Sequence, residues 1–166
     1  MPALKNRIGV NSGLATVGNM GSAKRFNYTA MGDTVNLASR LESANKAFGS
    51  SILIGPLTYA QAKDAIVSRP IAKVVVVGKT EPMAVYELLG IAGETDGPTL
   101  ALTAAFSRAH AALLRDDLEE ARRQLREATT HRPGDGPSLW LSHLIDEIAA
   151  GKRGRPWDGV IVLDEK

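Results

Sequence analysis

The stretch that decides the fold is Phe26-Asn27-Tyr28-Thr29-Ala30-Met31-Gly32-Asp33-Thr34-Val35-Asn36-Leu37-Ala38-Ser39-Arg40-Leu41-Glu42. Its first four residues alternate aromatic or β-branched with polar side chains, which predicts an extended strand. Asp33 or Thr34 can then cap a helix, and apolar residues recur at helical spacing to about Phe48, before Gly49 ends the helix. The stretch therefore predicts a strand followed by a helix.

Asn36 and Arg40 stand four residues apart on this predicted helix and so project from the same face. An amide and a guanidinium placed in this way can hold a ribose oxygen and a phosphate, the phosphate bidentately. Arginine also keeps its charge at any working pH, which suits a phosphoryl transition state. The alternative is a solvated helix face on which Arg40 pairs with a nearby glutamate, and spacing alone favours that alternative.

The flanking residues predict further short elements. Residues 7–11 and 14–18 are expected to be strands joined through Ser12-Gly13, with a loop over 18–22. Further along the chain we expect a strand at 51–54, a helix at 56–66, a strand at 71–77, a turn at 78–82 and a returning strand at 83–89. Together these elements predict an α+β layer with mainly antiparallel pairs.

The C-terminal half has a different pattern. Residues 91–97 are a predicted linker, and residues 98–150 predict a helical hairpin and a third helix, followed by a short mixed tail. The helices resemble one tetratricopeptide unit, which cannot bury its own apolar face, so we expect them to dock on the first part or on a partner. The predicted organisation is 1–90, a linker at 91–97, and a helical extension and tail at 98–166.

Composition excludes several function classes. The 166 residues are 44% hydrophobic and 23% charged, which is typical of a soluble globular protein. The absence of cysteine excludes disulfide scaffolds, thiolate zinc sites and cysteine nucleophiles. No P-loop or Gly-x-Ser-x-Gly motif occurs. His110, His131 and His143 lack metal-ligand spacing and are expected at the surface or between helices.

Charge is distributed unevenly along the chain. The first 32 residues contain Lys5, Arg7, Lys24 and Arg25 but no acidic residue, and the first carboxylate is Asp33. Four cations with few aromatic residues between them are a weak basis for nucleic-acid binding, so it remains a minor hypothesis.

Four segments resemble, in order, the class III adenylate and guanylate cyclases. They are residues 9–13, 17–22 and 28–42, together with 77–88, which resembles the closing hairpin of that domain. The resemblance covers about residues 6–90. It implies an α+β fold, a partial ferredoxin-like nucleotidyl cyclase core with an α-helical C-terminal extension.

The resemblance also implies roles for three residues. Asn36 would orient the ribose, and Arg40 would stabilise charge on the α-phosphate as the 3′-hydroxyl attacks. Thr29 stands where the family places a base-reading residue, which favours ATP over GTP; the alternative is an ordinary strand threonine. The family's phosphate-binding lysine falls at Val77 here, so Lys79 is expected to be a turn residue.

In the family, two aspartates hold Mg or Mn, and both belong before Gly9. Because no carboxylate precedes Asp33, we expect no metal ligands of this kind in the chain. The first strand, its helices and a hairpin of the usual core are also expected to be absent. The sheet should then lack an interior strand and expose an edge.

The first hypothesis is therefore an adenylate cyclase in intracellular signalling, converting ATP to cyclic AMP and pyrophosphate. This chain would be inactive alone and would act in a head-to-tail homodimer or with another cyclase domain. The alternatives are a non-catalytic cyclase-like interaction module and a tetratricopeptide-type adaptor. The resemblance implies a cytoplasmic chain without membrane contact. Trp157-Asp158-Gly159-Val160 resembles tails of some bacterial cyclases whose upstream regions are membrane-anchored.

Overall fold

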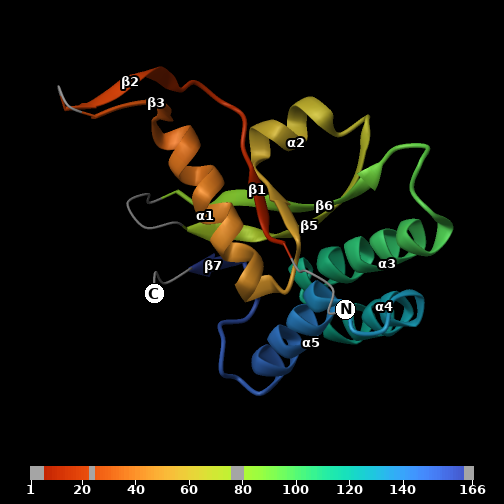
Figure 1. Ribbon diagram of the computed structural model, residues 1–166. Coiled ribbons are helices and arrows are strands. Elements are labelled where there is room, and N and C mark those ends of the chain that lie inside the picture. The colour runs from red at the N-terminus through yellow and green to blue at the C-terminus, as the bar shows by residue number, and fades with distance from the viewer. Residues whose placement is uncertain (1–5, 23–24, 76–80, 163–166) are drawn as a thin grey trace, which may run out of the picture.

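The computed structural model describes residues 6–22, 25–75 and 81–162 (Figure 1). The elements of the cyclase-like part are β1 (Ile8–Val10), β2 (Thr16–Ser22), β3 (Arg25–Met31), α1 (Asp33–Phe48), β4 (Ile52–Ile54), α2 (Pro56–Ala62), β5 (Ile66–Val75) and β6 (Met83–Ile91). They are followed by α3 (Gly97–Leu114), α4 (Leu118–His131), α5 (Gly136–Ala149) and β7 (Val160–Val162). The α+β class predicted from the sequence is confirmed.

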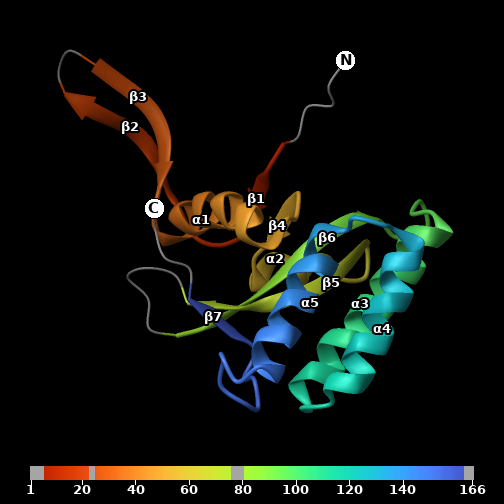
Figure 2. The same ribbon diagram turned by 90° about the horizontal axis from the view of Figure 1, so that it is seen from below.

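The described strands form a sheet in the order β1-β4-β6-β5-β7 and a separate ribbon of β2 and β3. Antiparallel pairs join β4 to β6 and β5 to β6, whereas the outer strands β1 and β7 pair in parallel with β4 and β5. The ribbon projects away from the rest of the molecule in both views (Figures 1 and 2). Among the described strands β1 forms one edge of the sheet, and its Ile8 and Val10 are exposed.

The short strands predicted at 7–11 and 14–18 are present as β1 and the start of β2, but they do not pair with each other. β1 pairs with β4, and β2 runs through Ser22 and pairs with β3, so residues 18–22 are strand rather than loop. The segment after β1 does not turn back because its side chains bind other elements. Asn11 Nδ2 donates to the carbonyl oxygen of Thr34 at 3.1 Å, and Thr58 Oγ1 donates to Ser12 Oγ at 3.1 Å.

Helix α1 has the predicted extent, and Gly49 ends it in the left-handed conformation at φ 67°. Its start differs from the prediction. The N-cap position is held by Gly32, at φ 136°, and Asp33 and Thr34 follow it in the first turn of the helix. Glycine is suited to this corner between β3 and α1 because other residues rarely adopt this backbone conformation.

The hairpin of β5 and β6 is confirmed, but β5 begins earlier than predicted. Helix α2 ends at Ala62 instead of the predicted Ile66, and residues 66–70, which lie before the predicted strand, are strand. Local sequence argues against a strand because Pro70 lacks an N–H donor, and the pairing register shifts between Pro70 and Ala72. Most of the predicted turn at 78–82, including Lys79, lies outside the described residues.

The C-terminal helices dock on the sheet, as expected. Helices α3 and α4 form the predicted hairpin, and α5 is the predicted third helix (Figure 2). Buried residues of α1, the sheet and these helices share a core cluster that includes Leu41, Phe48, Ile71, Val85, Phe106, Leu125, Leu141 and Ile145. The tail then returns to the sheet through β7, and Trp157 is buried.

A buried ion network joins the sheet to α5. Arg69 of β5 is fully buried; its Nε donates to Glu87 of β6 at 2.7 Å, and its two terminal nitrogens donate to Asp135 at 2.8 Å each. Burial would raise the pKa of both carboxyl groups. For Glu87 burial prevails and the pKa is raised, whereas for Asp135 the bonds and charge of Arg69 lower the pKa below its usual value.

His110 of α3 provides a test of this packing through pH. Its imidazole is buried against Trp157, with ring centroids 5.8 Å apart, and burial lowers its pKa to about 4. The folded-state pKa is thus below the unfolded value of about 6.5, so the unfolded chain takes up the proton first. The contribution of neutral His110 to the free energy of unfolding is therefore fully present above pH 6.5. It is lost as the pH falls from 6.5 toward 4.

We predict that the free energy of unfolding, measured by urea titration, falls by up to about 3 kcal/mol more between pH 7 and pH 4 in the wild type than in His110→Phe. His131→Phe, at an exposed position at the end of α4, should retain the wild-type pH dependence. If the free energy of unfolding changed equally with pH in the wild type and in His110→Phe, the lowered pKa of His110 would be contradicted.

Candidate functional site

The site is built on α1, and Gly9 of β1 allows that helix to lie close to the sheet. A Cβ atom at Gly9 would overlap the carbonyl oxygen of Ala38 and the backbone nitrogen of Glu42. Ala38 lies between Asn36 and Arg40 in the sequence. The strand therefore touches the backbone of the helical segment that carries both predicted site residues.

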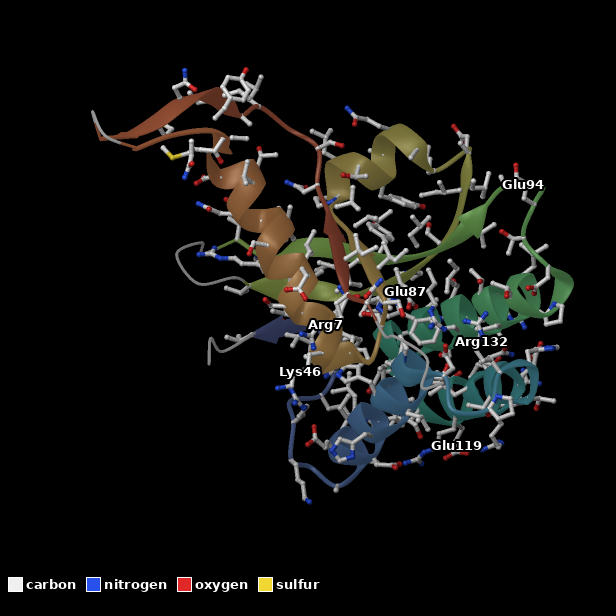
Figure 3. The ribbon with its side chains drawn as sticks, in the orientation of Figure 1. Arg7, Lys46, Glu87, Glu94, Glu119 and Arg132 are labelled. Carbon is white, nitrogen blue, oxygen red and sulfur yellow. The ribbon has the colours of Figure 1, made fainter. Side chains whose placement is uncertain are left out.

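Side chains further along α1 fasten it to the same strand. Asn45 is fully buried; its Nδ2 donates to the carbonyl oxygen of Ile8 at 3.0 Å, and its Oδ1 accepts from the Ser50 hydroxyl at 2.8 Å. Outside the core, Arg7 Nε donates to Glu42 at 3.1 Å (Figure 3). A buried amide with its hydrogen bonds satisfied fixes both position and rotation of a helix.

The structure places Asn36 and Arg40 one turn apart on α1, with Asn36 exposed and Arg40 half-buried. Thr29 lies on β3 of the projecting ribbon, exposed and paired with Gly18 of β2. The amide and the guanidinium thus lie on one helix, and the hydroxyl lies on the strand that leads into it. Such groups can bind a ribose, a phosphate and a base edge, and their assignment to those roles stays a prediction.

This donor set does not fit a divalent metal ion. Mg²⁺ binds oxygen ligands, usually including carboxylates, whereas Arg40 brings positive charge. Within residues 6–22, 25–75 and 81–162, no group of three or more histidine, aspartate or glutamate side chains could hold a metal ion. No helix in the same described part is long and apolar enough to cross a membrane.

Sequence reasoning missed the residues that support the site. Gly9 lies in a segment that resembles the cyclase family, but no packing role was predicted for it. Neither the role of Asn45 nor the Arg69 network was predicted. A signal existed for Glu87, because it is a charge inside the apolar strand Val85–Leu88. No local signal identified Arg69, the partner of Glu87 that lies 18 residues away, or Asp135, which binds Arg69 from 66 residues further along the chain.

Comparison with known proteins identifies the family. The model of the adenylate and guanylate cyclase catalytic domain matches residues 2–90, more than half of the chain. Adenylate cyclase 1 of Rhizobium meliloti is 42% identical over 91 residues, which are 55% of this chain and 14% of that protein. The terminal-differentiation-specific adenylate cyclase of Dictyostelium discoideum is 37% identical over 90 residues, 52% of this chain and 4% of that protein.

The chain therefore belongs to the family of adenylate and guanylate cyclase catalytic domains, as the motifs predicted. A solved structure, the adenylyl cyclase CyaB from P. aeruginosa, is similar at 39% identity and a TM-score of 0.47, over 54% of this chain and 45% of that one. The chain spans less than a fifth of the length of the two adenylate cyclases from R. meliloti and D. discoideum.

The close approach at Gly9 yields a prediction. Gly9→Ala should lower the free energy of unfolding by about 1–3 kcal/mol, because the new methyl group overlaps helix backbone that cannot rotate away. Gly18→Ala is the control, since a Cβ there meets nothing within 4 Å, and it should change stability by less than about 0.5 kcal/mol. Urea unfolding measures both, and equal stability of the two variants would show that α1 can move away from β1.

Proposed function

We propose that this chain supplies the transition-state half of an adenylate cyclase site, which converts ATP to cyclic AMP and pyrophosphate. The observation that carries the proposal is the pair Asn36 and Arg40, one turn apart on a helix that Gly9 and Asn45 fasten to the sheet. Family membership of residues 2–90 supports the reaction class. The adenylate cyclases from R. meliloti and D. discoideum support ATP as substrate.

In this mechanism each described residue has one task. Asn36 donates a hydrogen bond that orients the ribose, so that its 3′-hydroxyl is aligned with the α-phosphate. Arg40 stabilises the negative charge that grows on the α-phosphate oxygens as the bond to the 3′-oxygen forms and the bond to pyrophosphate breaks. The Thr29 hydroxyl accepts from the adenine amino group.

The divalent ions of this reaction would activate the hydroxyl and the leaving group, and the residues around α1 do not fit them. We therefore place the metal-binding carboxylates on a second cyclase domain, in a head-to-tail homodimer or a mixed complex. The adaptor alternative is less well supported, because α3–α5 use their apolar faces against the sheet.

Complementation tests this proposal. The chain alone should make no cyclic AMP with Mg²⁺ or Mn²⁺, but should restore synthesis when mixed with a cyclase domain that keeps its metal-binding aspartates and lacks the Asn and Arg. Arg40→Ala should lower the restored kcat by about 100-fold or more, and Asn36→Ala by about tenfold, since each removes transition-state contacts.

Arg126→Ala, at an exposed position of α4, is the control and should restore full activity. Turnover by the isolated chain would contradict the composite site. Full restoration by the Arg40→Ala variant would contradict the role of Arg40.

The base preference is tested in the same mixture. Thr29→Ala should lower kcat/KM for ATP about three- to tenfold, the value of one hydrogen bond, and leave the value for GTP unchanged. Thr16→Ala on the neighbouring strand is the matched control. An equal fall for both nucleotides would show that Thr29 does not read the base.

A further inference from the structure

The C-terminal end of α1 touches the first turn of α5. A Cβ atom at Gly136 would overlap the carbonyl oxygen of Gly49 and lie 2.8 Å from its Cα. One residue before Gly49, the Phe48 ring meets the Trp140 ring edge-to-face, with centroids 4.9 Å apart. The helix that carries Asn36 and Arg40 therefore ends against the helical extension.

The start of α5 is itself fixed to the sheet. Asp135 accepts two hydrogen bonds from Arg69 and caps α5 by accepting the backbone N–H of Ser138 at 3.0 Å. The Arg69 guanidinium also lies over the Phe106 ring of α3, 4.5 Å from its centroid. Figure 3 shows Glu87, the other partner of Arg69, where the sheet meets these helices. The surface that Phe48 and Gly49 contact is thus rigid.

Gly9 and the Asn45 bond to Ile8 hold the 16-residue helix α1 against β1, and α5 holds its C-terminal end. A helix is stiff over this length, so a displacement at Phe48 tilts the segment on the far side of Gly9. That segment holds Asn36, and Arg40 lies beside the contact between Gly9 and the helix backbone. Misplacement of a transition-state group by about 1 Å can cost about 100-fold in rate.

We propose that Trp140 and Gly136 of the helical extension are positioning residues for Asn36 and Arg40. Through Phe48 and Gly49 they set the tilt of α1, and so the alignment of the amide and guanidinium with the transition state. The proposal rests on the proposed function. It assigns the extension a part in the reaction that acts through α1.

The chain offers a matched control for this junction. Helices α3 and α5 both begin with Asp-Gly-Pro, at residues 96–98 and 135–137, and in both the aspartate caps the helix. A Cβ atom at Gly97 meets nothing within 4 Å, whereas one at Gly136 overlaps Gly49. Gly97→Ala therefore makes the same chemical change at the same helix position without touching α1.

The test measures kcat and KM for ATP in the complementation mixture, below the melting temperature of every variant. Trp140→Ala and Gly136→Ala should lower kcat tenfold or more while KM stays within twofold, because only transition-state alignment is lost. Trp140→Phe, which keeps an aromatic edge against Phe48, and Gly97→Ala should stay within twofold of the wild type. If the Gly136→Ala variant does not fold, the comparison of Trp140→Ala with Trp140→Phe tests the proposal by itself.

Leu102→Ala separates positioning from stability. Leu102 is buried in a small cluster with Ala105 and Ala128 that is separate from the main core. If the Leu102→Ala variant melts at the same temperature as the Trp140→Ala variant, it should still have the kcat of the wild type. A Trp140→Ala variant with kcat within twofold of the wild type, or a Leu102→Ala variant with the same loss as Trp140→Ala, would overturn the proposal.

Hydrogen exchange gives a readout that needs no activity. Trp140→Ala should speed amide exchange in residues 41–48 at least fivefold relative to Leu102→Ala. Unchanged exchange there would overturn the positioning role. Failure of the wild-type chain to restore cyclic AMP synthesis would instead reject the proposed function, and the exchange result would then decide by itself whether α5 holds α1.

Discussion

The buried guanidinium of Arg69 is the constraint on which the rest of the structure depends. A buried charge is costly unless it is paired and hydrogen-bonded, and Arg69 meets this requirement only when Glu87 and Asp135 are both in place. These partners come from a neighbouring strand and from the cap of α5. Satisfying one side chain therefore fixes the β5–β6 pairing and the position of the helical extension together.

The net stability from such a network is small, because pairing mainly offsets desolvation. Its effect is on specificity of packing: a different docking of α5 would leave Arg69 or Asp135 buried without a partner, which costs several kcal/mol. Burial raises the pKa of Glu87, whereas the hydrogen bonds and charge of Arg69 hold the pKa of Asp135 below its usual value despite burial.

Helix α1 connects this framework to the chemistry. Gly9 lets the middle of the helix touch β1, Asn45 fastens its last turns to Ile8, and Phe48 packs on Trp140. Asn36 and Arg40 thus lie on a supported helix, whereas Thr29 lies on the projecting β2–β3 ribbon. A two-stranded ribbon has little stability of its own, so Thr29 has less support than the two residues on α1.

Much of this could be predicted locally. Helix α1, the β5–β6 hairpin and the helices α3–α5 follow from apolar periodicity and from glycine and proline stops, which act within a few residues. The pairing of β1 with β4 could not, because Ser12-Gly13 suggested a turn and only contacts of Asn11 and Ser12 with distant residues decide otherwise. Residues 66–70 were missed because Pro70 argues locally against a strand, and only their pairing with β6 makes them one.

The sequence by itself determined the family, the order of motifs, and the spacing that places Asn36 and Arg40 on one helix face. These depend on residue identity and on local geometry. Only the tertiary structure decided how that helix is held, because its supports come from residues 9, 45, 69, 135 and 140. Each support depends on close contact or burial between segments far apart in the chain, and such contacts leave no periodic trace in the sequence.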